Sequence, residues 1–384
     1  MKGIETGEAG QRRFYSLDDS TLAALMRNLV EEELSVVDGG ILERFEAAAA
    51  ELYGAKHAVA TVNGTASIHL ALFAIDLIPG DEVILPTYGY YAMAVPVLLM
   101  GATPVFADVR EESLTIDVDD AAALVTPRTR AIIVHQPYGI PADFDALRAL
   151  ADEHGLAIIS DASHAHGATW RNEPVGAACE FLCASYGKGK LITGGELGVV
   201  TANDDVHRDR MLLYGHVNRV PKALITDEYR DVENAVGMKY RPHTFSMAFA
   251  VEQLKTFGER MGKLVDNCRR FEAGLADLSG LSPYETPEGG GRVYWRIPIR
   301  VDPARHPDIP ALVAKLTDLG VPAEKRNPKL VHAHNVISGY YGVETKREFP
   351  VAERVIAETF QLDSFPLFQD GAVDSFLEAF ANVG

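Results

Sequence analysis

Short runs of apolar residues recur along the first 200 residues, separated by segments of helix length. Seven of these runs have the length and composition of buried strands: residues 57–61, 82–85, 104–107, 131–134, 156–159, 180–184 and 197–201. Helical segments are predicted between them, at residues 68–75, 91–100, 118–124 and 142–154. This alternation predicts an α/β fold with a mostly parallel, seven-stranded sheet flanked by helices on both faces.

The pattern changes after about residue 202. The later segments predict a long helix over residues 246–280, a strand over 292–300 and a helix over 310–319. Near the N-terminus, residues 18–34 have helical apolar spacing behind an Asp or Ser N-cap. We therefore predict a large α/β domain over residues 1–245, N-terminal arm included, and a smaller C-terminal α+β domain over residues 246–384.

Composition excludes several classes of protein. The 384 residues are 47% apolar and 23% charged, as in ordinary globular domains. A net charge of −18 argues against nucleic acid as a partner, because nucleic-acid binding depends on clustered Lys and Arg. The cysteines at 179, 183 and 268 have neither metal-ligand nor disulfide spacing, so no metal site is expected. No signal peptide or apolar run of about 18 residues is present, which predicts a cytoplasmic protein without membrane contact.

Candidate chemistry lies where two predicted strands end. Asp161 closes one apolar run, and a Gly-rich loop with Lys188 and Lys190 follows Ser185 at the end of another. Taken singly, the Asp is explained equally well as a helix N-cap and each lysine as a solvated loop residue. Together they indicate a pyridoxal phosphate site, in which a carboxylate keeps the pyridine nitrogen protonated and a lysine forms a Schiff base. Spacing from the residues alone leaves both lysines as candidates.

A phosphate-binding turn precedes these residues. Gly64, Thr65 and Ala66 open a predicted helix directly after a strand, where backbone N–H groups bind phosphate well. Ser185 supplies a hydroxyl for a second phosphate contact, and Tyr90 is an aromatic residue suited to stacking on the pyridine ring. Each has a purely structural alternative: an ordinary capped turn for residues 64–66, a cap at the end of the strand for Ser185, and a core aromatic residue for Tyr90.

The ordered set resembles the DegT/StrS-type sugar aminotransferases, a branch of the fold-type I pyridoxal phosphate enzymes. The resemblance covers nearly the whole chain and is carried by Asn-Gly-Thr-Ala at 63–66, Pro-Gly-Asp-Glu-Val-Ile-Leu-Pro at 79–86, Gly-Ala-Thr-Pro-Val-Phe-Ala-Asp at 101–108 and Asp-Ala-Ser-His-Ala-His-Gly at 161–167. It is nearest to the cyclitol aminotransferases and the aminohydroxybenzoate synthases, which share the last motif. It implies the fold-type I aminotransferase fold.

The resemblance also implies residue roles. Lys190 follows the phosphate-binding serine by five residues and precedes Glu196 by six, so it matches the family's Schiff-base lysine, and Lys188 does not. His164 matches a Gln or His near the cofactor's phenolic oxygen, and His166 is interpreted as structural. Lys239 matches a residue that contacts phosphate in the neighbouring subunit, which implies a homodimer with shared active sites.

The implied activity moves an amino group from glutamate or glutamine to a keto-sugar or cyclitol ketone, in antibiotic or cell-surface sugar biosynthesis. Candidate substrate residues are four cations: His216, Arg219, Lys222 and Arg241. They predict a site for an anionic substrate group, with a solvated loop as the alternative. Residues 325–332 and Leu197 depart from the family pattern, so the acceptor stays open.

Four other functions are alternatives to amino-group transfer. Relatives that act as lyases or dehydratases replace the lysine with histidine, and the presence of Lys190 argues against that chemistry. An aromatising synthase on an amino-cyclohexenone is the strongest alternative. A non-catalytic cofactor-binding regulator is disfavoured because Asp161, Ser185 and Lys190 are all present. A nicotinamide enzyme is disfavoured because no Gly-x-Gly-x-x-Gly motif opens the first strand-to-helix turn.

Overall fold

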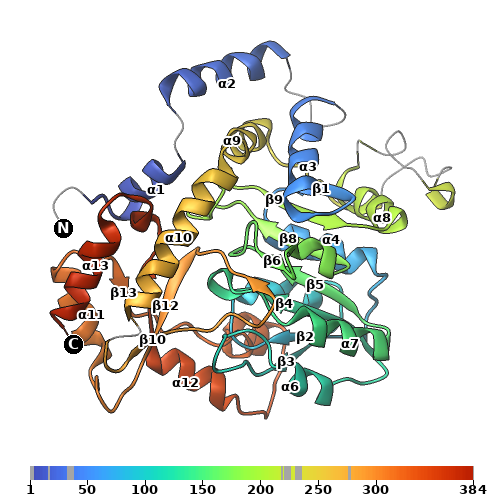
Figure 1. Ribbon diagram of the computed structural model, residues 1–384. Helices are drawn as coiled ribbons and strands as arrows, with labels where there is room; N and C mark the ends of the chain where they lie inside the picture. The colour runs from blue at the N-terminus through green and yellow to red at the C-terminus, as the bar shows by residue number, and fades with distance from the viewer. Residues whose placement is uncertain are drawn as a thin grey trace.

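The seven predicted strands form one sheet in the computed structural model, which describes residues 4–15, 18–32, 39–217, 219, 226–229, 236–275 and 278–383. Its strand order is β1-β9-β8-β5-β4-β2-β3. The strands are β1 (His57–Thr61), β2 (Glu82–Pro86), β3 (Thr103–Ala107), β4 (Thr129–His135), β5 (Ala157–Asp161), β8 (Phe181–Ser185) and β9 (Gly198–Ala202). Within this sheet only β9 is antiparallel to its neighbours, which confirms the prediction of a mostly parallel sheet (Figure 1).

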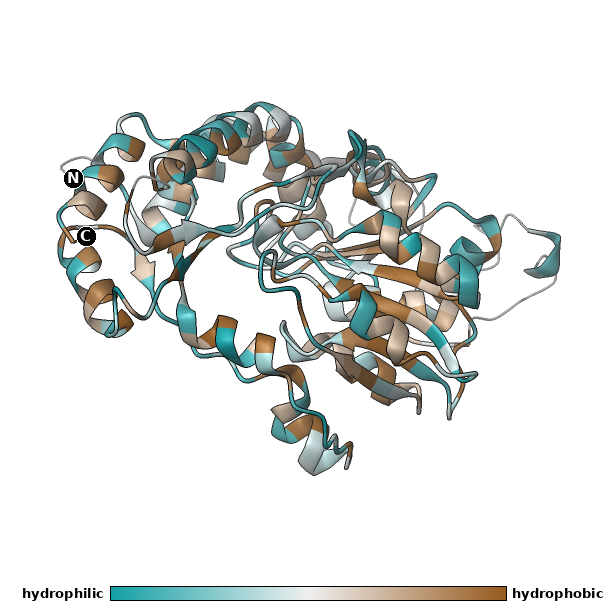
Figure 2. Ribbon diagram, turned by 60° about the horizontal axis from the view of Figure 1, so that its bottom comes forward, coloured by the Kyte–Doolittle hydropathy of each residue, from teal (hydrophilic) through white to brown (hydrophobic). Residues whose placement is uncertain are grey.

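Helices cover the sheet on both faces. They are α3 (Gly40–Tyr53), α4 (Gly64–Ala74), α5 (Ala94–Leu99), α6 (Val118–Ala123), α7 (Phe144–His154) and α8 (Asp205–Gly215). Alternate residues of β4 belong to different hydrophobic clusters: Ile132 and Val134 to one, and Ala131 and Ile133 to the other. Because both faces of the strand are buried, its sequence is continuously apolar. Figure 2 shows that single outer helices contain both hydrophobic and hydrophilic residues.

A second sheet is built from the C-terminal third of the chain. It contains β10 (Leu281–Pro283), β12 (Arg296–Val301), β14 (Thr359–Asp363) and β13 (Ala323–Glu324), in that order. Helices α11 (Ile309–Asp318), α12 (Pro350–Glu358) and α13 (Ala372–Ala381) accompany it. The predicted strand over residues 292–300 begins only at Arg296. The division of the chain at residue 246 stays a prediction.

The single long helix predicted over residues 246–280 is wrong. The segment forms α9 (Thr244–Leu254) and α10 (Phe257–Leu275), separated by a break. Arg260 stabilises the break: its guanidinium donates to the carbonyl oxygens of Gln253 and Phe14, each at 2.8 Å. A carbonyl freed at a helix end needs such a donor, and the same guanidinium also ties the break to the carbonyl oxygen of Phe14, a residue distant in sequence.

The N-terminal helix packs against the C-terminal part of the chain. In α1 (Gly7–Tyr15), the ring of Phe14 lies 5.0 Å from Phe365 and 5.5 Å from Phe368 between centroids. Helix α2 (Asp19–Glu32) lies at the edge of the molecule beside α9, with Leu25 and Leu29 buried (Figure 1). Among the described residues, no helix has the length and hydropathy to cross a membrane, and no group of three His, Cys, Asp or Glu is placed to hold a metal ion.

Candidate active site

Three polar side chains close three neighbouring parallel strands. His135 is the last residue of β4, Asp161 of β5 and Ser185 of β8. The carboxyl ends of parallel strands meet at one edge of the sheet, where α/β proteins bind ligands. All three residues line one cavity of about 540 Å³ at this edge. Trp295, before β12, and residues of β14 and of the segment after β13 also line it.

Asp161 is buried and ionised in this cavity. Burial raises the pKa of its carboxyl, but the imidazole of His135 and the amide of Ser163 more than offset this, so the pKa stays below its usual value. The amide of Ser163 donates to Asp161 Oδ1 at 3.0 Å, and His135 Nδ1 lies 3.6 Å from Oδ2. The site therefore holds a fixed negative charge suited to pairing with a protonated ring nitrogen.

The two candidate lysines point to different surroundings. Lys190 lines the cavity, with its Nζ 4.8 Å from the ring centroid of Trp295. Burial lowers the pKa of Lys190 to about 8, against the opposing attraction of Asp161. Lys188 is exposed and forms an ion pair with Glu8 at 2.6 Å. We therefore propose Lys190, and not Lys188, as the lysine that binds the cofactor covalently.

The predicted phosphate contacts lie together at one end of the cavity. Asn63 caps α4 by accepting a hydrogen bond from the amide of Ala66, and Gly64 and Thr65 line the cavity. A Cβ on Gly64 would lie 2.9 Å from Cβ of Ser185, so the glycine permits the close approach of the two segments. Ala66 does not line the cavity, and its amide is already engaged by Asn63.

Aromatic residues also line the cavity. His164 is stacked on Trp295 with centroids 3.6 Å apart and an interplanar angle of 13°. Burial, followed by the charge of Lys190, holds the pKa of His164 well below its usual value, so the ring is neutral. Tyr88 and Tyr138 share a hydrogen bond of 2.9 Å, and Tyr90, which is 59% exposed, lines the cavity at its rim.

The residues present fit pyridoxal phosphate. A helix N-terminus and a serine meet at one end, and a carboxylate and a lysine face the interior. Nδ1 of His164 is buried without a hydrogen-bond partner among the described residues, as expected where a ligand supplies the partner. His166, by contrast, is fully buried beside Tyr186 and does not line the cavity.

The predicted anion site is not formed around this chain's cavity. Arg219 is buried, and its guanidinium donates two hydrogen bonds to Glu46, at 2.8 and 2.9 Å. His216 is also buried and bonds the carbonyl oxygen of Ala60. Neither residue lines the cavity of its own chain, because each is paired with another group inside the fold. Their role as substrate residues stays a prediction. Arg241 is half-buried outside the cavity, and Lys222 lies outside the described residues.

Sequence reasoning gave no site role to several cavity residues, among them His135, Tyr138, Trp295 and Arg326. His135 follows a predicted strand directly, so its position at a strand end was a usable signal. Trp295 and Arg326 come from the C-terminal part of the chain, and no local pattern shows that they reach the cavity.

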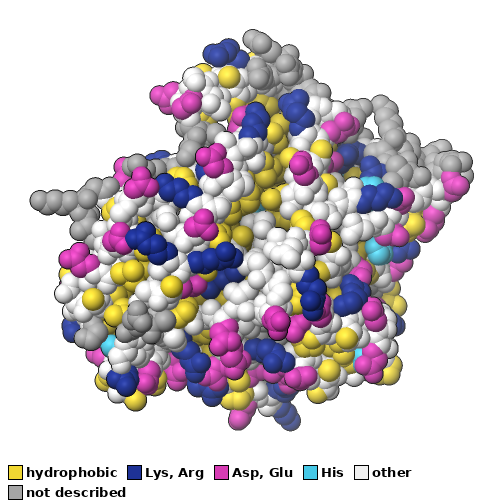
Figure 3. All heavy atoms as spheres, in the orientation of Figure 1, with side chains coloured by type: hydrophobic (Ala, Val, Ile, Leu, Met, Phe, Trp, Pro, Cys, Tyr) yellow, Lys and Arg dark blue, Asp and Glu magenta, His cyan; other side chains and the backbone are white. Residues whose placement is uncertain are grey.

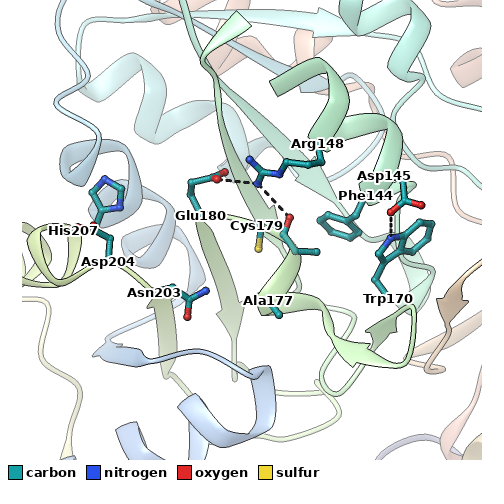
Figure 4. Close-up of a pocket in the computed structure, with 11 residues that line it drawn as sticks. Phe144, Asp145, Arg148, Trp170, Ala177, Cys179, Glu180, Asn203, Asp204 and His207 are labelled. Atoms are coloured by element: carbon teal, nitrogen blue, oxygen red, sulfur yellow. Dashed lines mark hydrogen bonds and ion pairs between the residues drawn. The ribbon is translucent and has the colours of Figure 1, made fainter. Parts of the chain in front are cut away.

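A second hollow of about 610 Å³ lies at the opposite end of the strands (Figure 4). Glu180 precedes β8 there, and Asn203 follows the antiparallel β9. Figure 4 shows Arg148 paired with Glu180, and Trp170 bonded to Asp145. These polar groups are matched within the protein, and α/β sheets do not usually bind ligands at this edge.

Comparisons with known proteins agree with this geometry. Residues 17–381 match the DegT/DnrJ/EryC1/StrS aminotransferase family. The chain is 30% identical to GDP-perosamine synthase of Vibrio cholerae, over 90% of this chain and 91% of that one. It is 35% identical to L-glutamine:2-deoxy-scyllo-inosose aminotransferase of Streptomyces paromomycinus, over 73% and 68%.

Solved structures are similar as well. The aminotransferase of Psychrobacter cryohalolentis superimposes with a TM-score of 0.87 at 26% identity, covering 96% of this chain and 98% of that one. A 3-amino-5-hydroxybenzoic acid synthase superimposes with a TM-score of 0.83 at 25% identity, covering 96% and 97%. The chain thus has the fold-type I aminotransferase fold, and it belongs to the DegT/DnrJ/EryC1/StrS family of pyridoxal phosphate-dependent aminotransferases.

Proposed function

We propose that this enzyme transfers the amino group of glutamate or glutamine to a ketone of a sugar or cyclitol. The observation that carries the proposal is the cavity itself. Lys190 and Asp161 line it together with Gly64, Thr65 and Ser185, the groups proposed to bind phosphate, and with several aromatic side chains. Relatives named for perosamine and for scyllo-inosose chemistry support a polyhydroxylated acceptor.

Pyridoxal phosphate, when bound, serves as an electron sink for the substrate's Cα. In this proposal Ser185 and the turn at Gly64 and Thr65 bind its phosphate, and Asp161 holds the proton on its ring nitrogen. Lys190 binds the cofactor covalently between turnovers, and its Nζ carries the proton to and from the substrate carbon. A lysine pKa of about 8 suits this task, because the neutral amine is then available near neutral pH.

The aromatic and apolar lining of the cavity favours a ring with apolar C–H faces. Tyr88, Tyr138 and Trp295 present aromatic surface there, and Met93 and Pro328 add apolar surface. Sugar and cyclitol rings combine such faces with hydroxyl groups that need few charged partners. This wall supports a ring ketone whose binding does not depend on Arg219, which Glu46 already neutralises.

A second candidate is an aromatising synthase that acts on an amino-cyclohexenone. It is supported by 30% identity, over 80% of this chain, to 3-amino-5-hydroxybenzoate synthase of Amycolatopsis mediterranei. The same cofactor-binding groups would serve it. The products differ: an aromatic amino acid absorbs in the near ultraviolet, and an amino-cyclitol does not.

We also propose a homodimer in which Lys239 reaches the partner's phosphate site. Lys239 is exposed and does not line its own chain's cavity. Its neighbours Val236 and Met238 are exposed by 67% and 55%. Figure 3 shows a band of apolar side chains between α9 and α3 on the same molecule. Apolar surface of this kind is typical of a subunit interface.

The test follows the cofactor's absorbance. Glutamate or glutamine added to the loaded enzyme should shift the spectrum to that of the aminated cofactor. A panel of keto-sugars and cyclitol ketones should then restore the original spectrum, and the active member identifies the acceptor class. If no amino acid changes the spectrum, the proposed function fails. Formation of an aromatic product would instead favour the synthase.

A further inference from the structure

We infer that helix α1 positions Lys190, with Tyr15 as the positioning residue, a role that rests on the proposed function of Lys190 in binding the cofactor. Lys190 lies in a loop, residues 186–197, that contains neither a helix nor a strand. The loop is rich in glycine, so its own side chains restrain its backbone little. The place of the lysine therefore depends on bonds that other segments make to the loop.

One face of α1 runs along this loop. Three pairs of residues meet there: Glu8 with Lys188, Gln11 with Gly189 and Tyr15 with Lys190. The three α1 residues are spaced by three and by four, which puts their side chains on the same side of a helix. Helix α1 is therefore placed to act on the three consecutive loop residues that end at Lys190.

The contact that carries the inference is made by Tyr15. Its hydroxyl donates to the carbonyl oxygen of Lys190 at 2.8 Å. Among the described residues, this is the only hydrogen bond given to that oxygen. The carbonyl carbon is bonded directly to Cα, so holding the carbonyl fixes the direction in which the lysine side chain leaves the backbone.

The other contacts of α1 with the loop are weaker. Glu8 and Lys188 are exposed by 66% and 78%, so water and salt screen their ion pair. Tyr15 is half-buried, and burial, followed by the charge of Asp363, raises the pKa of its hydroxyl. The hydroxyl therefore stays protonated near neutral pH and is always able to donate.

Helix α1 is itself fixed to the C-terminal part of the chain. Just before the helix, the backbone of Glu5 exchanges two hydrogen bonds with the side-chain amide of Gln369, at 2.9 and 2.7 Å. At the other end, Arg260 donates to the carbonyl oxygen of Phe14, and the ring of Phe14 packs on Phe365. A helix held at both ends can serve as a fixed support for the loop.

The opposite side of the loop is held by Trp295. Its indole N–H donates to the carbonyl oxygen of Gly189 at 2.7 Å. Neighbouring carbonyls of the loop thus accept hydrogen bonds from residues near opposite ends of the chain. Trp295 also stacks on His164 and lines the cavity, so a substitution there would change the cavity itself. Tyr15 does not line the cavity, which makes it the cleaner residue to test.

The experiment separates covalent attachment of the cofactor from its binding. Pyridoxal phosphate has an aldehyde, with which the Lys190 amine condenses as water is released, and pyridoxamine phosphate has none. Both are given to the cofactor-free wild type, Tyr15→Phe and Tyr284→Phe. Tyr284 is the matched control, because it is buried, its hydroxyl shares a hydrogen bond with Thr359, and it does not line the cavity.

We expect Tyr15→Phe to slow covalent attachment about tenfold, because a displaced amine meets the aldehyde in fewer productive orientations. Stopped-flow absorbance measures this rate. The affinity for pyridoxamine phosphate, measured by calorimetry, should not change, since the phosphate and ring sites are intact. Tyr284→Phe should match the wild type in both measurements, and melting curves check that each variant is folded.

Three results overturn the inference. The first is an attachment rate in Tyr15→Phe equal to that of the wild type. The second is a parallel loss of pyridoxamine phosphate affinity, which would mean that Tyr15 supports the whole site and not the lysine. The third is the same slowing in Tyr284→Phe.

Failure of the proposed function would look different. A wild type that attaches the cofactor but transfers no amino group contradicts that function, while the attachment rates still test Tyr15. If the wild type attaches no cofactor, trace acetylation of the cofactor-free protein replaces them, with exposed Lys315 as reference. In Tyr15→Phe the reactivity profile of Lys190 should move from a midpoint of about 8 toward that of an ordinary lysine, about 10.4. An unchanged profile overturns the inference.

Discussion

Lys188 and Lys190 are two residues apart but face different surroundings, because the loop turns at the glycine between them. Gly189 adopts a φ of 83°, so Lys188 faces solvent and Glu8 while Lys190 faces the cavity. Borohydride reduction of the loaded enzyme should fix the pyridoxyl group on Lys190, as read by peptide mapping. Lys188→Ala is the matched control and should keep the label. A label on Lys188 would contradict the assignment.

The pKa of Lys190 predicts the pH dependence of cofactor attachment. Only the neutral amine is nucleophilic, and burial brings the pKa of this lysine down to about 8. The rate of covalent attachment to the cofactor-free protein should rise with pH up to about 8 and then level off. An ordinary lysine would continue to gain up to about pH 10.4. Stopped-flow absorbance measures the profile, and a rate still rising steeply at pH 9 would refute it.

Asp161 should matter through its charge. Asp161→Asn keeps the size of the side chain and removes the negative charge that would stabilise the protonated ring nitrogen. We expect turnover to fall on the order of 10³-fold, about 4 kcal/mol of transition-state stabilisation. The protein should stay folded, as checked by its melting curve. Near-normal turnover would mean that the carboxylate serves only to accept the amide of Ser163.

At the scale of elements, one buried ion pair joins α3 to the segment after α8. Glu46 on α3 accepts from Arg219 and also from the amide of Ala60 on β1. Arg219→Ala would leave a buried carboxylate with a lost partner, which typically costs about 3–5 kcal/mol. Thermal unfolding should show this loss, whereas the salt dependence of acceptor binding should not change. A stable variant with weaker acceptor binding would support Arg219 as a substrate residue.

At the scale of the whole molecule, the proposed dimer predicts complementation. Subunits with Lys190→Ala are mixed with subunits with Lys239→Ala, each inactive or impaired alone. A shared site gives the mixed dimer one intact and one doubly damaged site, so activity should return. Mixed dimers that form without recovery would show that each site is built from one chain.

The chain's own pattern was sufficient for the central sheet and for much of the site. Strands buried on both faces leave continuous apolar runs, so all seven were predictable to within about two residues. The carboxyl ends of parallel strands converge, so residues that close those runs, such as Asp161 and Ser185, were predictable as neighbours. These features depend on local composition and on a general rule of topology.

Other features depend on contacts between distant segments. The break between α9 and α10 is stabilised by Arg260, which reaches the carbonyl of Phe14. Arg219 and Lys190 are both cations near glycines in sequence, yet one is neutralised by Glu46 and the other faces a cavity. Arg326 lines that cavity because pairing of β13 with β14 carries it there. Sequence alone therefore determined the sheet and the strand ends that line the cavity, because local apolar patterning encodes them. Only the tertiary structure decided which charges are free for a substrate, since that depends on the partner each charge meets after folding.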